Sequence, residues 1–442
     1  MFRLESADKL TQEMVRELIV KFRGEDLPRL KKLKDYYLNK TAILRRPCVD
    51  PSKPNNKVVH PFAQYITDTL VGYFVGEPVV YSSNENINDL KMVFEYNDEQ
   101  DENTSIAKDC SIYGRAWEQI YVDKDGNVRF VALDPREVIP VYSTSLENEL
   151  VAVVRFYMNR DLVFGVDEMI VEVYTDKEII RYKTGDAVAD LHLIDRKQHG
   201  FNSVPIVEYR NNDDCYGDFE GVISLIDAYD VLVSDDLNDF EYFVDAYLAL
   251  YGYTAEPEDI AKMKQQRVLL MDNDSKAEWL VKKGDSQGVE TTKERIERDI
   301  HKFSKTPNSN DKNFGGNTSG VAMKYKLLGT ENIASIKERK FKKGLQRRLE
   351  LISNILKTLS RPSFDWLGID ITFTRNIPIN EDDVSAMVKN LNGIVSKQTL
   401  VAQLPFIDDP EQEMKQLNDE IKQSIFYANP QLELNQEEEV VE

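Results

Sequence analysis

The sequence predicts an α+β protein in which helices precede a mostly antiparallel sheet and further long helices follow it. Up to Tyr113 the apolar residues recur every three or four positions, the period of a helix. From Ala116 the apolar residues alternate, and Asp125-Gly126 forms a typical hairpin turn between two alternating runs. After Asn211 a helical period returns, now in a strongly acidic segment. This order indicates an α+β domain with a helical extension.

Composition and charge exclude several classes of protein. The chain has 442 residues, enough for about two to four domains, and 41% of them are hydrophobic. Its formal net charge of −21 argues against a static, sequence-independent grip on nucleic acid, which needs lysine and arginine facing the phosphates. The charge leaves open a protein that surrounds DNA without holding it.

The cysteines and the N-terminus bear on the compartment. Cys48, Cys110 and Cys215 lack the spacing of a metal knuckle or a redox pair, so we expect reduced, buried thiols in a cytosolic product. The N-terminus is too charged for a signal peptide. No apolar run reaches the roughly 18 residues of a membrane span, so we expect none.

The first segments read as helices. One covers Thr11 to Tyr37, and we expect Gly24 and Pro28 to interrupt it. Another begins at Pro61, with Ile66, Leu70 and Tyr73 on one face, and ends at Gly76. Short helices are expected at Ile87–Tyr96 and Thr104–Tyr113.

The alternating runs then predict a set of strands. They are Ala116–Val122, Val128–Leu133, Val138–Tyr142, Leu150–Tyr157, Glu168–Tyr174, Glu178–Tyr182, Leu191–Ile194 and Val204–Tyr209.

An acidic helix follows. No lysine or arginine occurs between Arg210 and Lys262, while apolar residues from Val222 to Val244 recur in steps of three and four. Such a helix would repel itself in isolation, so we expect it to pack against positively charged neighbours or other copies. Its acidic side is interpreted as a solvated or channel-lining face. The aspartates singled out on it are Asp227, Asp230, Asp235, Asp236 and Asp239.

A small insert separates this helix from a second one. Short strands are expected at Leu248–Tyr251, Val268–Met271 and Glu278–Val281, with a helix at Glu258–Lys264. Val289 to Phe303 is helical again. The pattern predicts a hairpin-like stalk with a knob at its end.

The stretch from Ser304 to Gly329 is the most distinctive part of the chain. It is a polar loop rich in asparagine and glycine that becomes a helix at the N-cap Ser319. We expect that helix to run toward Leu359, with bends at Gly329 or Gly344. Its basic run, Lys337 to Arg348, either contacts nucleic acid or neutralises the acidic helix.

The remaining segments are short. Ile369–Thr374 reads as a strand that could rejoin the first sheet. Asn380 caps a helix, others begin near Lys397 and Asp409, and the terminal NQEEEVVE is predicted to be a disordered acidic tail.

Catalytic motifs are weak. GGNTSG at Gly315–Gly320 could cradle a phosphate, but it lacks the P-loop lysine and no strand leads into it. The groups Asp213/Asp214, Asp235/Asp236/Asp239 and Asp272/Asp274 could form a two-metal nuclease site, but no histidine is near them. His60 is interpreted as a local structural residue. The residues therefore favour a protein without catalysis.

Five segments of the chain carry a family signature. They are NNKVVHPFAQYITDTLVGYFVGEPV (Asn55–Val79), SIYGRAWEQIYVDKDG (Ser111–Gly126), DPREVIPVYS (Asp134–Ser143), DKNFGGNTSGVAMKYKLLG (Asp311–Gly329) and QTLVAQLPFIDDPEQEM (Gln398–Met414). These segments resemble the Gp6-like portal protein family of tailed bacteriophages of Gram-positive bacteria. They occur in the family's order along nearly the whole chain, and the loop with SGVAMKYKLLG is the most specific.

The resemblance implies a multidomain portal fold that assembles into a ring of roughly twelve copies. It implies a wing, a helical stem, a small α/β clip and a helical crown. The ranges are 1–217 and 361–378 for the wing, 218–247 and 289–303 for the stem helices, 248–288 for the clip, 304–318 for a tunnel loop, 319–360 for a long helix back to the wing, 379–428 for the crown, and 429–442 for the tail.

A portal at a capsid vertex is a conduit through which double-stranded DNA is packaged and ejected. The resemblance implies DNA-facing loop residues Lys305, Asn308, Asn310, Lys312, Asn313 and Asn317, and hinge residues Gly315, Gly316 and Gly320. It implies partners in the terminase large subunit, a head–tail adaptor, and scaffold and major capsid proteins, with no cofactor, metal or membrane. It places the protein in the virion after synthesis in the host bacterial cytoplasm.

Two other classes stay open at this point. One is a metal-dependent DNA-processing enzyme that uses the aspartate clusters. The other is a virion adaptor without a DNA tunnel.

Overall fold

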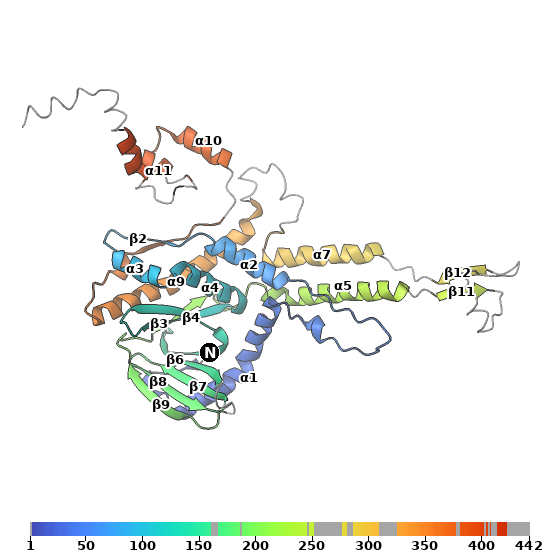
Figure 1. The fold of residues 1–442 in the computed structure, drawn as a ribbon, viewed down its shortest axis with the longest axis horizontal. Coiled ribbons are helices and arrows are strands. Elements are labelled where there is room, and N and C mark those ends of the chain that lie inside the picture. Colours follow the sequence, from blue (N-terminus) through green and yellow to red (C-terminus); the bar gives the residue numbers. More distant parts are fainter. Residues whose placement is uncertain are drawn as a thin grey trace, which may run out of the picture. The chain divides into compact units, whose positions relative to one another are not determined.

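Figure 1 shows the fold in a computed structural model of the chain. The structure describes residues 2–160, 167–185, 188–244, 247–251, 276–280, 286–308, 325–376, 381–401, 404, 407 and 413–421. The chain divides into two units. The first joins Met1–Asn308 to Gly329–Asn376, and the second joins Ser309–Leu328 to Ile377–Glu442.

The first long helix, α1, runs without a break from Gln12 to Tyr37. The prediction that Gly24 and Pro28 interrupt it was wrong. Pro28 removes one helical hydrogen bond and crowds the carbonyl of Gly24, four residues earlier. The buried face of α1, which includes Ile19, Phe22 and Leu33, keeps the helix continuous despite that cost.

Three further helices follow in the N-terminal part. They are α2 (Phe62–Val75), α3 (Asn88–Tyr96) and α4 (Glu99–Tyr113), so the fourth begins five residues before the predicted start at Thr104. Gly114 ends α4 with a φ of 86°, and its N–H donates to Cys110 O at 2.8 Å. A Cβ at this position would lie 2.0 Å from the backbone oxygen of Cys215, so the turn requires glycine.

The predicted strands form two sheets. The order in the larger sheet is β1 (Phe2–Arg3), β5 (Val138–Tyr142), β6 (Leu150–Arg160), β7 (Asp167–Tyr174), β8 (Glu178–Thr184) and β9 (His192–Gln198). The smaller sheet is β10 (Ile206–Arg210), β3 (Arg115–Val122) and β4 (Val128–Leu133). Among these strands only the pair β1–β5 is parallel.

A third, two-stranded sheet corrects the prediction for Ile369–Thr374. Its strand β13 (Asp370–Thr372) pairs with β2 (Val80–Ser82) and does not rejoin the sheets above. Ile371 and Phe364 are buried with the residues of α3 and α9 (Leu328–Thr358), so this small sheet closes the core on that side.

The acidic segment forms α5 (Ile223–Val244), after a short 3₁₀ turn at Glu220–Val222. It lies beside α7 (Ser286–Ser304), as Figure 1 shows, and we call α5 and α7 the helix pair. Ile226, Tyr229 and Ile300 belong to one apolar cluster. Strands β11 (Tyr247–Tyr251) and β12 (Lys276–Leu280) pair between the two helices. The predicted helix at Glu258–Lys264 and the strand at Val268–Met271 lie outside the described residues.

An extended segment, residues 56–60, is bound along α5 by side chains of that helix. The N–H groups of Asn56, Val58 and His60 donate to Asn238 Oδ1 (2.7 Å), Ser234 Oγ (3.0 Å) and Asp230 Oδ1 (3.0 Å). Two residues of an extended chain advance about 6.6 Å and four residues of a helix about 6 Å. The repeats match, so every second N–H meets an acceptor on successive helical turns. We call these three bonds the side-chain ladder.

Arg348 holds α9 in the core of the same unit. Its side chain is fully buried, and it donates to both carboxylate oxygens of Glu118 at 2.7 and 2.9 Å. It also donates to Glu99 Oε1 at 3.0 Å and to Asn103 Oδ1 at 2.8 Å. These bonds join α9 to α4 and β3. Gly344, one turn earlier, lets α9 approach β10, since a Cβ there would lie 2.3 Å from the ring of Tyr209.

The second unit contains short helices. They are α10 (Glu381–Leu391), α11 (Lys397–Val401) and a helical stretch at residues 413–421. The predicted tail, 429–442, and the predicted cap Asn380 lie outside the described residues. Throughout the part of the chain that the structure describes, no helix is long and apolar enough to cross a membrane.

Replacing Arg348 should destabilise the first unit strongly. In Arg348→Met the carboxylates of Glu118 and Glu99 stay buried without their cation, which costs about 3–5 kcal/mol. Arg347→Met is the control, because Arg347 is partly exposed. It pairs with Glu350, a contact worth about 1 kcal/mol or less, and donates to Ser203 Oγ. Chemical unfolding followed by fluorescence measures both. Equal losses in the two variants would contradict the assignment.

Removing the middle bond of the side-chain ladder should loosen residues 54–61. Ser234→Ala leaves the N–H of Val58 without its acceptor, at a cost of about 1–3 kcal/mol. Hydrogen exchange measured by mass spectrometry should then be faster in peptides that cover this segment. Ser224→Ala on the exposed side of α5 is the matched control. Unchanged exchange in Ser234→Ala would argue that the ladder does not hold the segment.

Candidate functional site

The loop that follows α7 starts from a fixed base. Ser304 and Thr306 are buried, and Lys305 between them has a φ of 55°. The carbonyl of Lys305 accepts from Thr330 Oγ1 of α9 at 2.8 Å, and the carbonyl of Pro307 accepts from Tyr65 Oη of α2 at 2.8 Å. Three helices, α2, α7 and α9, therefore hold residues 304–307, which we call the loop base.

His301, a residue of α7, makes a further contact with the loop base. Its Nδ1 lies 3.2 Å from the carbonyl oxygen of Thr306, which can only accept, so Nδ1 carries the proton. The ring packs edge-on against Tyr65 at 5.5 Å between centroids. Burial lowers the pKa of His301, so the imidazole is neutral near pH 7.

Two of the predicted loop residues lie in this base. Lys305 is exposed, and Asn308 Nδ2 donates to Glu297 Oε1 of α7 at 3.1 Å. The other predicted positions lie outside the described residues: Asn310, Lys312, Asn313, Gly315, Gly316, Asn317 and Gly320. The same holds for the N-cap Ser319 and for the phosphate-cradle reading of Gly315–Gly320.

Asp230 corrects the interpretation of a solvated acidic face on α5. Its side chain is fully buried, and its carboxylate accepts from Thr41 Oγ1 at 2.7 Å, from the N–H of His60 at 3.0 Å and from His60 Nδ1 at 2.9 Å. A buried carboxylate is tolerated only when its oxygens are hydrogen-bonded in this way. His60 has the structural role that the sequence predicted.

The other aspartates of α5 also have partners within the chain. Asp227 accepts from Tyr36 Oη at 2.7 Å, and burial together with this bond raises the pKa of the Tyr36 hydroxyl. Asp235 pairs with Arg46, and Asp236 pairs with Lys293 of α7 at 2.6 Å. Asp239 likewise has an interaction partner. The positively charged neighbours that we expected for this helix are therefore Arg46 and Lys293.

The basic run of α9 pairs with carboxylates outside α5. Lys337 pairs with Asp218, and both side chains are nearly buried, while Lys340 pairs with Asp213. Arg348 is buried with Glu118 and Glu99. In the described structure, this run therefore neutralises the acidic segment only at the residues that precede α5, Asp213 and Asp218. The burial of Lys337 and Arg348 removes both side chains from contact with nucleic acid.

The aspartate clusters do not assemble into a metal centre in the described structure. No group of three or more His, Cys, Asp or Glu side chains among the described residues is placed to hold a metal ion. Asp213 and Asp235 face lysine and arginine partners instead. Asp272 and Asp274 lie outside the described residues.

Sequence reasoning missed the residues that position this site. Ser234 and Asn238 were not singled out, although their spacing of four from Asp230 places three polar side chains on successive turns of one helix face. Tyr65 and Thr330 were missed as well. Nothing local in the sequence marks them, because their acceptors are carbonyl groups 242 and 25 residues away.

Comparison with known proteins gives a consistent result. The model of the family described as phage portal protein, SPP1 Gp6-like, matches residues 19–425. The portal protein of Bacillus phage SPP1 is 27% identical over 400 residues, which cover 85% of this chain and 78% of that protein. The portal protein of Clostridium phage phiCD119 is 26% identical over 438 residues, covering 86% and 90%.

Solved structures give weaker similarities. A chain in the neck of a native GTA particle, computed with C12 symmetry, has a TM-score of 0.46 and 10% identity, covering 79% of this chain and 90% of that one. A chain in the neck of an empty GTA particle, computed with C6 symmetry, has a TM-score of 0.43 and 10% identity, covering 80% and 89%.

The family match spans most of the chain, and it includes α2, the helix pair and the loop base. This family does not support the alternative of a DNA-processing enzyme, because its members are structural components of the virion. The chain belongs to the SPP1 Gp6-like family of phage portal proteins, and it is a structural head–tail connector.

Proposed function

We propose that copies of this chain form a closed ring at one vertex of the capsid, and that double-stranded DNA passes through the ring during packaging and ejection. The observation that carries the proposal is the match to the portal family across residues 19–425. Roughly twelve copies would close the ring. The terminase large subunit, a head–tail adaptor, and the scaffold and major capsid proteins would bind its outer surfaces.

We assign the described elements to the parts of a portal. The two sheets with α1 to α4 and β13 correspond to the wing, within 1–217 and 361–378. Helices α5 and α7 correspond to the stem, and β11 and β12 to the clip between them. The loop 304–318 is proposed as the tunnel loop, α9 as the long helix that returns to the wing, and α10 and α11 as part of the crown.

Charge explains how a ring could pass DNA without retaining it. DNA carries about one negative charge per 1.7 Å of its axis. Helix α5 has no lysine or arginine, so any of its surface that faces the channel repels the phosphates. The cations on the proposed tunnel loop, Lys305 and Lys312, would touch the DNA backbone transiently.

The loop base gives the proposed tunnel loop a defined origin. Its bonds to Tyr65 and Thr330 tie it to α2 and α9, so a force on the loop is transmitted to the body of the subunit. A DNA-contacting loop needs such an anchor, because DNA moving through the ring drags it along the axis. We therefore propose that the loop beyond Asn308 contacts DNA and gates the channel.

Deleting Asn310–Asn317 should separate assembly from DNA handling. Rings should still form, since the described contacts of the loop base are kept, while DNA packaged per particle should decrease severely. Packaged DNA is measured by nuclease protection in a packaging reaction. Deleting Asn435–Glu442, a segment of equal length in the tail, is the control. Normal packaging and retention by the loop-deleted rings would contradict the proposed role.

The loop base should weaken at mildly acidic pH. Because the pKa of His301 is lowered on folding, its protonation below the unfolded value of about 6.5 favours the unfolded state. Stability from the neutral ring is thus complete above that pH and is lost as the pH falls toward the folded pKa.

The measurement is the thermal midpoint of wild type and His301→Gln at pH 7.5 and pH 5. Wild type should lose more over this interval than the variant, whose glutamine does not titrate. The comparison removes the contribution of other titrating groups, including His199, whose pKa is also lowered by burial. An identical pH dependence in both proteins would show that His301 is not the titrating group.

A further inference from the structure

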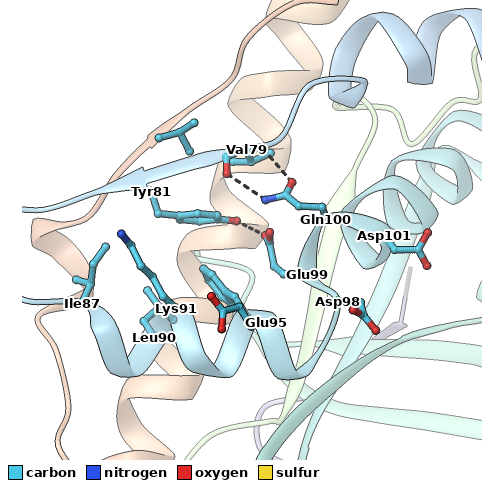
Figure 2. A pocket seen from close by; sticks show the side chains of 12 residues that line it. Val79, Tyr81, Ile87, Leu90, Lys91, Glu95, Asp98, Glu99, Gln100 and Asp101 are labelled. Carbon is cyan, nitrogen blue, oxygen red and sulfur yellow. Dashed lines mark hydrogen bonds between the residues drawn. The ribbon is translucent and has the colours of Figure 1, made fainter. Parts of the chain in front are cut away.

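A groove lies between β2 and α3, away from the site described above. Figure 2 shows its residues, and its volume is about 700 Å³. The lining is apolar on the inside, with Ile87, Leu90 and Phe94 contributing buried side chains. Figure 2 shows Lys91 rising from α3 toward Tyr81, across the space between the two elements. The groove is therefore apolar inside and bordered by a strand on one side.

Among the described residues, the strand that borders the groove has one unpaired edge. β2 pairs with β13 on its other side, and no other described strand joins this sheet. Gln100 fills part of the open edge, because its side-chain amide bonds both the N–H of Val79 (3.0 Å) and the carbonyl of Val79 (3.2 Å). In a strand, residues two apart direct these groups to the same side. Tyr81 therefore directs its own N–H and carbonyl to the side on which Gln100 lies.

Gln100 shows what the edge can bind. Its amide occupies one residue position in the manner of a neighbouring strand and leaves the next position open. An extended peptide offers the same pair of groups at every second residue. Such a peptide would continue the pairing that Gln100 begins, with alternate side chains entering the apolar part of the groove.

The groove is acidic where α3 ends and α4 begins. Glu95 and Asp98 are exposed there, and the described structure gives these carboxylates no ion-pair partner. Asp101 of α4 is also exposed, but Figure 2 shows its carboxylate directed away from Tyr81. Glu99, which is 3% exposed, accepts from the Tyr81 hydroxyl through Oε1, and its Oε2 has no hydrogen-bond partner in the described structure. Unpaired carboxylates beside an apolar groove are complementary to a basic side chain with an apolar stem.

We propose that this groove binds an extended segment of a partner protein, which adds as a strand to the open edge of β2. A lysine or arginine of that segment lies near Glu95 and Asp98. Main-chain bonds to Tyr81 provide the pairing, and the acidic end selects the basic side chain. Nucleic acid is excluded as the occupant by the same carboxylates.

Selection from a random heptapeptide library tests the proposal. The full-length protein is the target, and Lys91→Trp serves as the blocked form because an indole at this exposed position fills the groove. Met92→Trp is the matched control, since Met92 is the next residue of α3, is 66% exposed and does not line the groove. Enriched peptides should alternate apolar residues and carry one lysine or arginine. Their affinity should decrease about tenfold in Lys91→Trp and stay unchanged in Met92→Trp.

Two further comparisons separate strand pairing from apolar or purely ionic binding. N-methylation of alternate backbone amides in an enriched peptide should weaken binding about tenfold, because it removes the main-chain donors. The double variant Glu95→Gln, Asp98→Asn should remove the preference for lysine or arginine over glutamine in the peptide. The exposed pair Glu147→Gln, Glu149→Gln changes the net charge equally and should have no effect.

The proposal is overturned by any of three results. The first is that no peptide is enriched on wild type relative to Lys91→Trp. Lys91→Ala checks that the helix is intact and should behave like wild type. The second is enrichment of acidic or wholly apolar peptides. The third is an N-methylated peptide that binds as tightly as its parent.

Discussion

The side-chain ladder between α5 and residues 56–60 is the interaction on which the position of the helix pair depends. A helix with many aspartates and no cation has little reason to pack on a protein of net charge −21. Asp230, Ser234 and Asn238 solve this by acting as hydrogen-bond acceptors for a backbone that needs partners. The acidic helix is thus held by its own polar groups, with Arg46 and Lys293 adding local charge pairs.

The ladder has consequences further along the chain. Once α5 is placed, Ile226 and Tyr229 define where Ile300 of α7 packs, and Lys293 pairs with Asp236. The end of α7 then carries the loop base to Tyr65, on the helix that follows residues 56–60. Arg348 holds α9 from the other direction, so Thr330 meets the carbonyl of Lys305. Both sides of the proposed tunnel loop are therefore connected to the core of the subunit.

Local patterns in the sequence predicted elements well and their partners poorly. The hairpin Ala116–Leu133 and the helix pair follow from periodicity, which needs only neighbouring residues. The bond from Val58 to Ser234 spans 176 residues and that from Arg348 to Glu118 spans 230, so no local rule contains them. For the same reason the sequence predicted a solvated acidic face on α5. Its most buried aspartate, Asp230, instead makes the most hydrogen bonds of the five. The family, by contrast, is evident from the sequence, because several motifs occur in the family's order along the chain and such a set is shared by proteins of one fold.

The central claim is that this chain builds a ring with a DNA channel, and electron microscopy of the purified protein tests it most directly. A reconstruction should show a closed ring with an open axial channel and with the loop after Asn308 at the channel wall. In each copy the face of α5 that carries Asp230 and Ser234 should point toward the body of its own subunit. Particles that remain single chains at every salt concentration, or rings without an open channel, would contradict the account.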